Sequence, residues 1–145
     1  MSRCIVALGV LAGLAHVAHA DKGADCSYLE ITATSGKQPA IDPELKPLQK
    51  KLTKRPFSSW NTFHKLSAGT VKLVQLKPVP LKLQKGASTV MLRDRSDSRL
   101  ELTITMDGAD GKRWLDTKQS VPAGDWTIWV QNVGDDGHIF ALTCK

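Results

Sequence analysis

The sequence predicts an all-β fold, a single β-sandwich of immunoglobulin-like character, and three observations support this prediction. Apolar and polar residues alternate at period two along several segments, as in strands with one buried face. Turn residues interrupt these segments about every eight to twelve residues, which is typical of sandwiches and small barrels. Beyond residue 20, apolar residues occur at helical spacing only in one short segment, near residues 43–53.

The first twenty residues predict a secretory signal peptide. Arg3 supplies a positive charge, residues 5–18 are mostly small and apolar, and Ala18-His19-Ala20 has the small-x-small pattern that signal peptidase cleaves. The apolar run has about fourteen residues, whereas a membrane-spanning helix needs roughly twenty. We therefore expect residues 1–20 to be removed and residues 21–145 to form one exported domain, periplasmic or extracellular, without a transmembrane anchor.

Removal of the signal peptide would leave two of the three cysteines, Cys26 and Cys144. In an oxidising compartment such a pair is expected to form a disulfide, here between the first and last strands. The bond would close a loop of about 118 residues, for which chain entropy predicts roughly 4–5 kcal/mol of stabilisation. The alternative is two unpaired buried thiols. A lipoprotein is not expected, because Leu14 stands where a lipobox requires cysteine.

The predicted strands follow one another along the chain and are separated by turns rich in glycine, proline and aspartate. The clearest is residues 100–106, in which four apolar residues occupy every second position. Asp-Gly turns at 107–111 and 134–137 are typical of hairpins. In order, the predicted strands are residues 27–34, 71–73, 79–83, 100–106, 112–119, 126–130 and 139–143.

The helical exception begins after Asp42, which suits an N-cap, and Pro43, which suits the first helical position. Leucines at 45, 48 and 52 form one apolar stripe, with lysines on the other positions. Pro47 lacks a backbone N–H and limits the helix to one or two turns. The sequence therefore predicts a short helical insertion near residues 43–53.

Motifs for catalysis are absent from the sequence: it has no HExxH, GxSxG, Gly-rich phosphate loop, CxxC or EF-hand pattern. The mature chain would contain two histidines, His64 and His138. A small hydrolase or metal protein could use either histidine. His138 and Cys144 would share one strand face, but no methionine follows Cys144 as a blue-copper site would require. We therefore predict a protein that is not an enzyme and holds no cofactor or metal.

Positive charge is concentrated in the middle of the chain. Residues 43–95 carry twelve basic and two acidic side chains, whereas residues 21–42 and 96–145 are net acidic. A basic stretch interleaved with aromatics could bind a polyanion, such as lipopolysaccharide, an acidic glycan or nucleic acid, the last being least expected after export. The alternative is a solvated helix face followed by core aromatics. The cationic candidates are Lys46, Lys50, Lys51, Lys54 and Arg55, followed by Trp60.

Four tryptophans offer a second kind of contact. Trp126 and Trp129 are three residues apart, so on one strand their side chains point to opposite faces. One is expected in the core, and an exposed one would be a candidate for sugar stacking. We include Trp129 with Trp60 among the candidate binding residues, although core or rim positions for both are the alternative.

The stretch from Ile41-Asp42-Pro43-Glu44-Leu45 through Pro56-Phe57-Ser58-Ser59-Trp60-Asn61-Thr62-Phe63, followed by lysine-rich alternating strands, resembles small exported bacterial β-sandwich proteins that are mostly uncharacterised. The resemblance covers about a third of the chain and implies no activity for particular residues.

The sequence as a whole predicts a non-enzymatic binding or accessory protein of the cell envelope. It would contact an envelope protein or an anionic glycan or lipid surface, not nucleic acid, through residues 46–65 or an exposed strand edge. The alternative is a carbohydrate-binding module that uses an exposed tryptophan.

Overall fold

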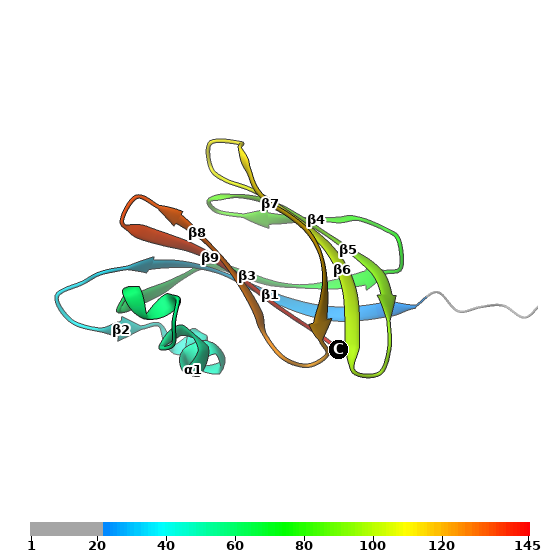
Figure 1. Ribbon diagram of the computed structural model, residues 1–145, viewed down its shortest axis with the longest axis horizontal. Coiled ribbons are helices and arrows are strands. Elements are labelled where there is room, and N and C mark those ends of the chain that lie inside the picture. The colour runs from blue at the N-terminus through cyan, green and yellow to red at the C-terminus, as the bar shows by residue number, and fades with distance from the viewer. Residues whose placement is uncertain (1–21) are drawn as a thin grey trace, which may run out of the picture.

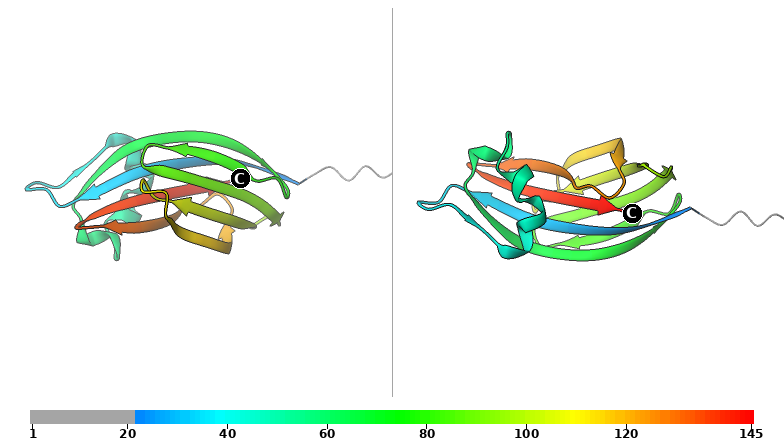
Figure 2. Two further views of the ribbon diagram at one scale, coloured as in Figure 1. Left: turned by 90° about the horizontal axis from the view of Figure 1, so that it is seen from above. Right: turned by 90° about the horizontal axis from the view of Figure 1, so that it is seen from below.

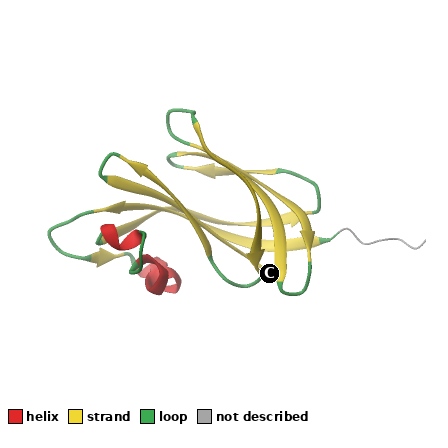
Figure 3. Cartoon of the chain, in the orientation of Figure 1, coloured by secondary structure: helices red, strands yellow, loops and turns green. Residues whose placement is uncertain are grey.

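The structure, a computed structural model, describes residues 22–145, and the predicted signal peptide of residues 1–20 lies outside the described residues. The described chain forms two β-sheets that pack face to face (Figure 1). Strands dominate it, and helix is confined to one side (Figure 3). The predicted β-sandwich class is confirmed.

Sheet A has the strand order β2-β3-β1-β9-β8, and sheet B the order β4-β5-β6-β7. Neighbouring strands are antiparallel, except that β2 and β3 are parallel. Sheet B is therefore a simple meander, whereas the centre of sheet A pairs the first strand with the last. The strands are β1 (Gly23–Thr34), β2 (Ala40–Ile41), β3 (Thr62–Val74), β4 (Val79–Leu83), β5 (Gly86–Arg95), β6 (Arg99–Asp107), β7 (Arg113–Pro122), β8 (Thr127–Val133) and β9 (Asp136–Cys144).

Each predicted strand coincides with an observed one, but the sequence indicated neither β5 nor the two-residue strand β2. The inward-facing positions of β5 include Ser88 as well as Val90 and Leu92, and its outward positions include Met91. Because the polarity of the two faces differs little, the period-two signal is weak there. Strand β3 begins at Thr62, nine residues before the predicted strand, because its first half carries many polar side chains.

The predicted helical insertion is confirmed and comprises η1 (Pro43–Leu48) and α1 (Gln49–Leu52), followed by η2 (Phe57–Ser59). Leu45, Leu48 and Leu52 are fully buried against the face of sheet A that points away from sheet B. Asp42 occupies the N-cap position but makes no side-chain cap hydrogen bond. Its carboxylate instead accepts the backbone N–H of Lys65 at 2.7 Å.

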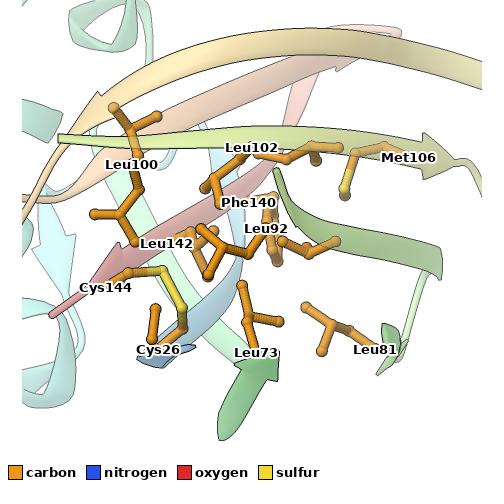
Figure 4. Close-up of a cluster of buried hydrophobic side chains, with 14 residues drawn as sticks. Cys26, Leu73, Leu81, Leu92, Leu100, Leu102, Met106, Phe140, Leu142 and Cys144 are labelled. Carbon is orange, nitrogen blue, oxygen red and sulfur yellow. A yellow bond between two sulfur atoms is a disulfide. The ribbon is translucent and has the colours of Figure 1, made fainter. Parts of the chain in front are cut away.

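Sheet A is thus covered on both faces, by sheet B on one side and by the helical segment on the other (Figure 2). Because both faces of sheet A are covered, four successive residues of β9, Ile139–Leu142, are buried. A strand with one solvent-exposed face would instead alternate buried and exposed residues. Between the sheets, leucines and Met106 of β6 face Phe140 and Leu142 of β9, with Leu92 from β5 (Figure 4).

The predicted disulfide is present. Cys26 of β1 and Cys144 of β9 lie directly opposite each other in the sheet, with their Cα atoms 4.1 Å apart and both residues buried. The bond joins the first and last strands at one end of the core between the sheets (Figure 4). Among residues 22–145, no helix is long and apolar enough to cross a membrane.

Replacing both cysteines, as Cys26→Ala with Cys144→Ala, should lower the free energy of unfolding by about 2–5 kcal/mol, because the bond constrains a 118-residue separation in the unfolded chain. Urea denaturation of the oxidised protein and the double variant measures this difference. Reductant should destabilise the wild type to a similar degree and leave the variant unchanged. Equal unfolding midpoints for the oxidised protein and the variant would show that the bond contributes nothing.

Candidate functional site

The helical segment presents a cluster of cations to solvent. Because its leucine stripe faces sheet A, the lysines between the leucines point outward. Lys51 pairs with Asp125 at 2.9 Å across to the start of β8. The other four cations are exposed and have no ion-pair partner within residues 22–145. We call these four the basic surface: Lys46, Lys50, Lys54 and Arg55.

An open groove of about 600 Å³ lies beside the helical segment. Lys46, Gln49 and Thr53 line it from the helical side, and Trp60 and Asn61 line it from the segment that leads into β3. Its floor is apolar and includes Leu52 and Phe63. Asp42 also lines the groove, so the groove combines an apolar base with an indole and one side chain of each charge sign, which is the composition of many small ligand sites.

Trp60 is held rigidly in this groove. Its indole Nε1 donates a hydrogen bond to the backbone carbonyl of Asp135 at 2.8 Å, in the hairpin between β8 and β9. Its ring lies against Gly137, where a Cβ atom would come within 2.9 Å of the ring carbons. Glycine at 137 is therefore needed for this close contact. Asn61 is also fixed, since its amide exchanges two hydrogen bonds with the backbone of Gly36.

Trp129 lies elsewhere. It packs against the core between the sheets, where its ring stacks on Phe140 with centroids 6.0 Å apart and its Nε1 donates to Gln119 at 3.1 Å. Trp126 packs against the helical side of sheet A, so the predicted opposite orientation of the two tryptophans is observed. The structure therefore brings Trp60 together with the basic surface and separates Trp129 from it by the thickness of sheet A.

The two histidines also have structural partners. His64 Nδ1 lies 2.9 Å from a carboxylate oxygen of Asp42, on the exposed side of β3. His138 is buried and lies 2.9 Å from a carboxylate oxygen of Glu30. Within the described residues, no group of three or more histidine, cysteine, aspartate and glutamate side chains is placed to hold a metal ion.

Glu30 is the centre of a buried polar cluster that the sequence analysis missed. Its carboxylate is fully buried and accepts four hydrogen bonds: from His138 Nε2 at 2.9 Å, from the Ser67 hydroxyl at 2.6 Å, and from the backbone N–H groups of Gln84 at 2.7 Å and Lys85 at 2.8 Å. These donors come from β9, from β3 and from the turn between β4 and β5. One carboxylate therefore ties both sheets together at one end of the sandwich.

A signal for this cluster exists in the sequence. Glu30 falls at the same period-two positions as Cys26 and Tyr28, the face of β1 that points toward sheet B. A charge on a core-facing position must be paired and hydrogen-bonded. A bulge in the β1–β3 pairing follows Glu30 and leaves Ser67 opposite it.

The four donors fix the charge state of Glu30. Burial by itself raises the pKa of a carboxylate, but hydrogen bonds from His138, Ser67 and the two backbone amides outweigh burial and lower the pKa of Glu30 from 4.5 to about 2. The carboxylate is therefore ionised at neutral pH. A neighbouring cavity of about 250 Å³ is lined by His138, Lys85, Asp110 and Asp136, among others, and so carries both charge signs.

Comparisons with known proteins do not identify a family for this chain. No protein-family model matches it, and no curated protein matches its sequence. Among solved structures, it is similar to the T2SS secretin XcpQ from Pseudomonas aeruginosa, with a TM-score of 0.39 and 11% sequence identity. The match covers 85% of this chain but 58% of the secretin chain, so this chain spans less than two thirds of that structure. The resemblance to uncharacterised exported β-proteins is not confirmed by these comparisons and remains a prediction.

Replacing Glu30 with glutamine should lower stability at neutral pH by about 3 kcal/mol, the energy equivalent of a pKa that falls from 4.5 to about 2. A carboxyl whose pKa is depressed by folding contributes its full stability above pH 4.5 and loses it as pH falls toward 2. Urea denaturation between pH 7 and 2 should therefore show a deficit for Glu30→Gln that shrinks as the pH falls.

Glu44→Gln is the matched control, because Glu44 pairs with Lys65 on the exposed surface, where such pairs contribute little. The free energy of unfolding of Glu44→Gln should depend on pH in the same way as that of the wild type. A Glu30→Gln variant whose stability parallels that of the wild type over this pH range would contradict the proposed role of the buried carboxylate.

Proposed function

We propose that this protein is an exported, non-enzymatic binding protein of the cell envelope that engages an anionic partner through the basic surface. The observation that carries the proposal is the set of four exposed cations within residues 46–55, none of which forms an ion pair in residues 22–145. No acidic residue occurs between Glu44 and Asp94 in the sequence, so this charge is not balanced locally. Such a cluster attracts and orients an anion over about one Debye length, roughly 8–10 Å at physiological salt.

Two further features support this proposal. The Cys26–Cys144 disulfide is typical of an oxidising compartment outside the cytoplasm. Both histidines of the described chain are paired with a carboxylate that also accepts backbone N–H groups, so each has a structural partner.

Reversing charge on the basic surface, as Lys50→Glu, Lys54→Glu and Arg55→Glu together, should weaken binding to heparin, used as a polyanion probe, by at least about tenfold at low salt. The reason is that three attractive contacts become repulsive. The matched control is Lys77→Glu, Lys82→Glu and Lys118→Glu, which changes net charge equally at exposed positions in and beside sheet B. Affinity and its salt dependence can be measured by titration calorimetry.

The control variant should keep most of the wild-type affinity. An equal loss in both variants would mean that heparin responds to net charge alone, and the basic surface would then have no special role.

A second candidate function is carbohydrate recognition in the groove, favoured by the fixed indole of Trp60 beside Lys46. Titration with soluble glycans from the cell envelope should then quench tryptophan fluorescence. Trp60→Leu should abolish the change, and Trp129→Phe should preserve it, because Trp129 packs on the opposite face of sheet A from the groove. Quenching that persists in Trp60→Leu would exclude this groove as the sugar site.

A further inference from the structure

We propose that β8 is a docking edge, to which an extended acidic segment of a partner protein adds as a further strand of sheet A. This inference rests on the proposed function, because it assigns the anionic partner of the basic surface to a class: a strand-forming peptide that carries carboxylates. It also specifies how the partner is held, by backbone hydrogen bonds along β8 and by charge across the helical segment.

The four outer strands of the two sheets differ in how they are protected from strand addition. Natural edges are protected by shortness, proline, charge or bulges. β2 has only two residues, β4 contains Pro80 and Lys82, and β7 contains Asp116, Lys118 and a terminal proline. β8, with the sequence Thr-Ile-Trp-Val-Gln-Asn-Val, has seven residues and neither charge nor proline. β3 also has a free edge beyond Phe63, because β2 pairs only with Thr62 and Phe63, but this edge carries His64, Lys65 and Lys72. Of the edges in residues 22–145, β8 is therefore the one that is longer than two residues and carries neither charge nor proline.

The backbone of β8 has the groups that an added strand would need. In an antiparallel pair, every second residue directs its N–H and C=O toward the partner strand, and the others direct theirs away. β8 pairs with β9 on one side, and within the described chain no other element makes a backbone hydrogen bond to residues 127–133. The neighbouring β7 reaches β8 through the side-chain hydrogen bond from Trp129 to Gln119, on the side of sheet B. The outward groups of β8 remain available.

The basic surface lies along this same edge. The Lys51–Asp125 ion pair fixes α1 next to the residues that precede β8. Toward the other end, Pro56 lines an open cavity of about 360 Å³ together with Val130 and Asn132 of β8. The segment between Lys51 and Pro56 therefore runs beside β8, on the face of sheet A that the helical segment covers (Figure 2). A strand added at β8 would point every second side chain toward this segment, so carboxylates at those positions would meet the cations.

The same geometry disfavours a second copy of this chain as the occupant. Two β8 strands that paired antiparallel around a twofold axis would place both helical segments on one face of the joined sheet. The two basic surfaces would then approach each other across the junction, and like charges that approach in this way repel. A foreign acidic strand instead brings carboxylates to the cations of the basic surface. Charge complementarity therefore selects the partner.

The test uses the full exported chain and a capped ten-residue peptide in which valine alternates with glutamate. Two further peptides carry N-methyl groups, one on every valine nitrogen and the other on every glutamate nitrogen. Since alternate N–H groups of an added strand face β8, one methylated peptide should lose binding and the other should keep it. A peptide with lysine in place of glutamate should bind at least about tenfold more weakly, a difference of about 1.4 kcal/mol.

Hydrogen exchange of the β8 amides, followed by NMR, locates the bound peptide. The valine–glutamate peptide should slow exchange at alternate residues of β8 and leave β4 and β7 unchanged. The variant with Lys50→Glu, Lys54→Glu and Arg55→Glu should bind this peptide at least about tenfold more weakly than the wild type does. The control variant with Lys77→Glu, Lys82→Glu and Lys118→Glu should bind it with nearly wild-type affinity.

Three results would overturn the inference. If both methylated peptides bind as well as the parent, and charge reversal still removes binding, then the basic surface binds anions without strand addition and the proposed function stands alone. If sedimentation shows a dimer with β8 amides protected in the absence of peptide, the occupant is a second copy. If the valine–glutamate peptide fails to bind at millimolar concentration, β8 is not a docking edge for acidic strands.

Discussion

The burial of sheet A on both faces is the constraint on which the other features of this fold depend. Two hydrophobic clusters, one between the sheets and one beneath the helical segment, share the strands β1, β3 and β9. Because three leucines of the helical segment must face sheet A, the lysines between them are forced outward. Lys46 and Lys50 of the basic surface therefore follow from this packing, whereas Lys54 and Arg55 lie in the exposed turn after α1. Sheet A supports the helical segment, and the Lys51–Asp125 pair holds it beside β8.

The Glu30 cluster fixes sheet B against sheet A at the end of the sandwich opposite the disulfide. Apolar contacts are not directional, so they hold the sheets together without defining their mutual position closely. The hydrogen bonds of the buried Glu30 carboxylate are directional, and their donors come from β3, β9 and the β4–β5 turn, so they define how the two sheets are placed relative to each other. Such a cluster adds specificity even where its net contribution to stability is modest.

The sequence was sufficient for the fold class, the disulfide and the helical insertion, and insufficient for the site. Period-two alternation in residues 100–106 and the helical spacing of the leucines at 45, 48 and 52 are local signals, so they can be read from one segment. Strand β5 lacked such a signal, because Ser88 and Met91 reduce the contrast between its faces. Lys51 and Asp125 are 74 positions apart, and the donors to Glu30 lie 37 to 108 positions from it. No local sequence pattern encodes contacts over such separations.

Trp129 illustrates the same limit. Its spacing from Trp126 correctly placed the two rings on opposite faces, but spacing does not say which faces are covered. Both faces of sheet A are covered, so neither ring is left as an open platform. Trp60, by contrast, has its position set by a hairpin about 75 residues further along the chain.

The pairing of β1 with β9 has a consequence for how the chain can reach this structure during its synthesis. Sheet B is built from one continuous stretch, residues 79–122, and its strand pairs are close in sequence, so it can assemble as soon as that stretch is free. The central pair of sheet A joins the two ends of the chain, so β1 must wait for the last residues before it gains its second neighbour. A chain whose last residues have not yet left the ribosome cannot complete this sheet. The topology therefore keeps sheet A incomplete until the final strand is available, although sheet B can already have formed.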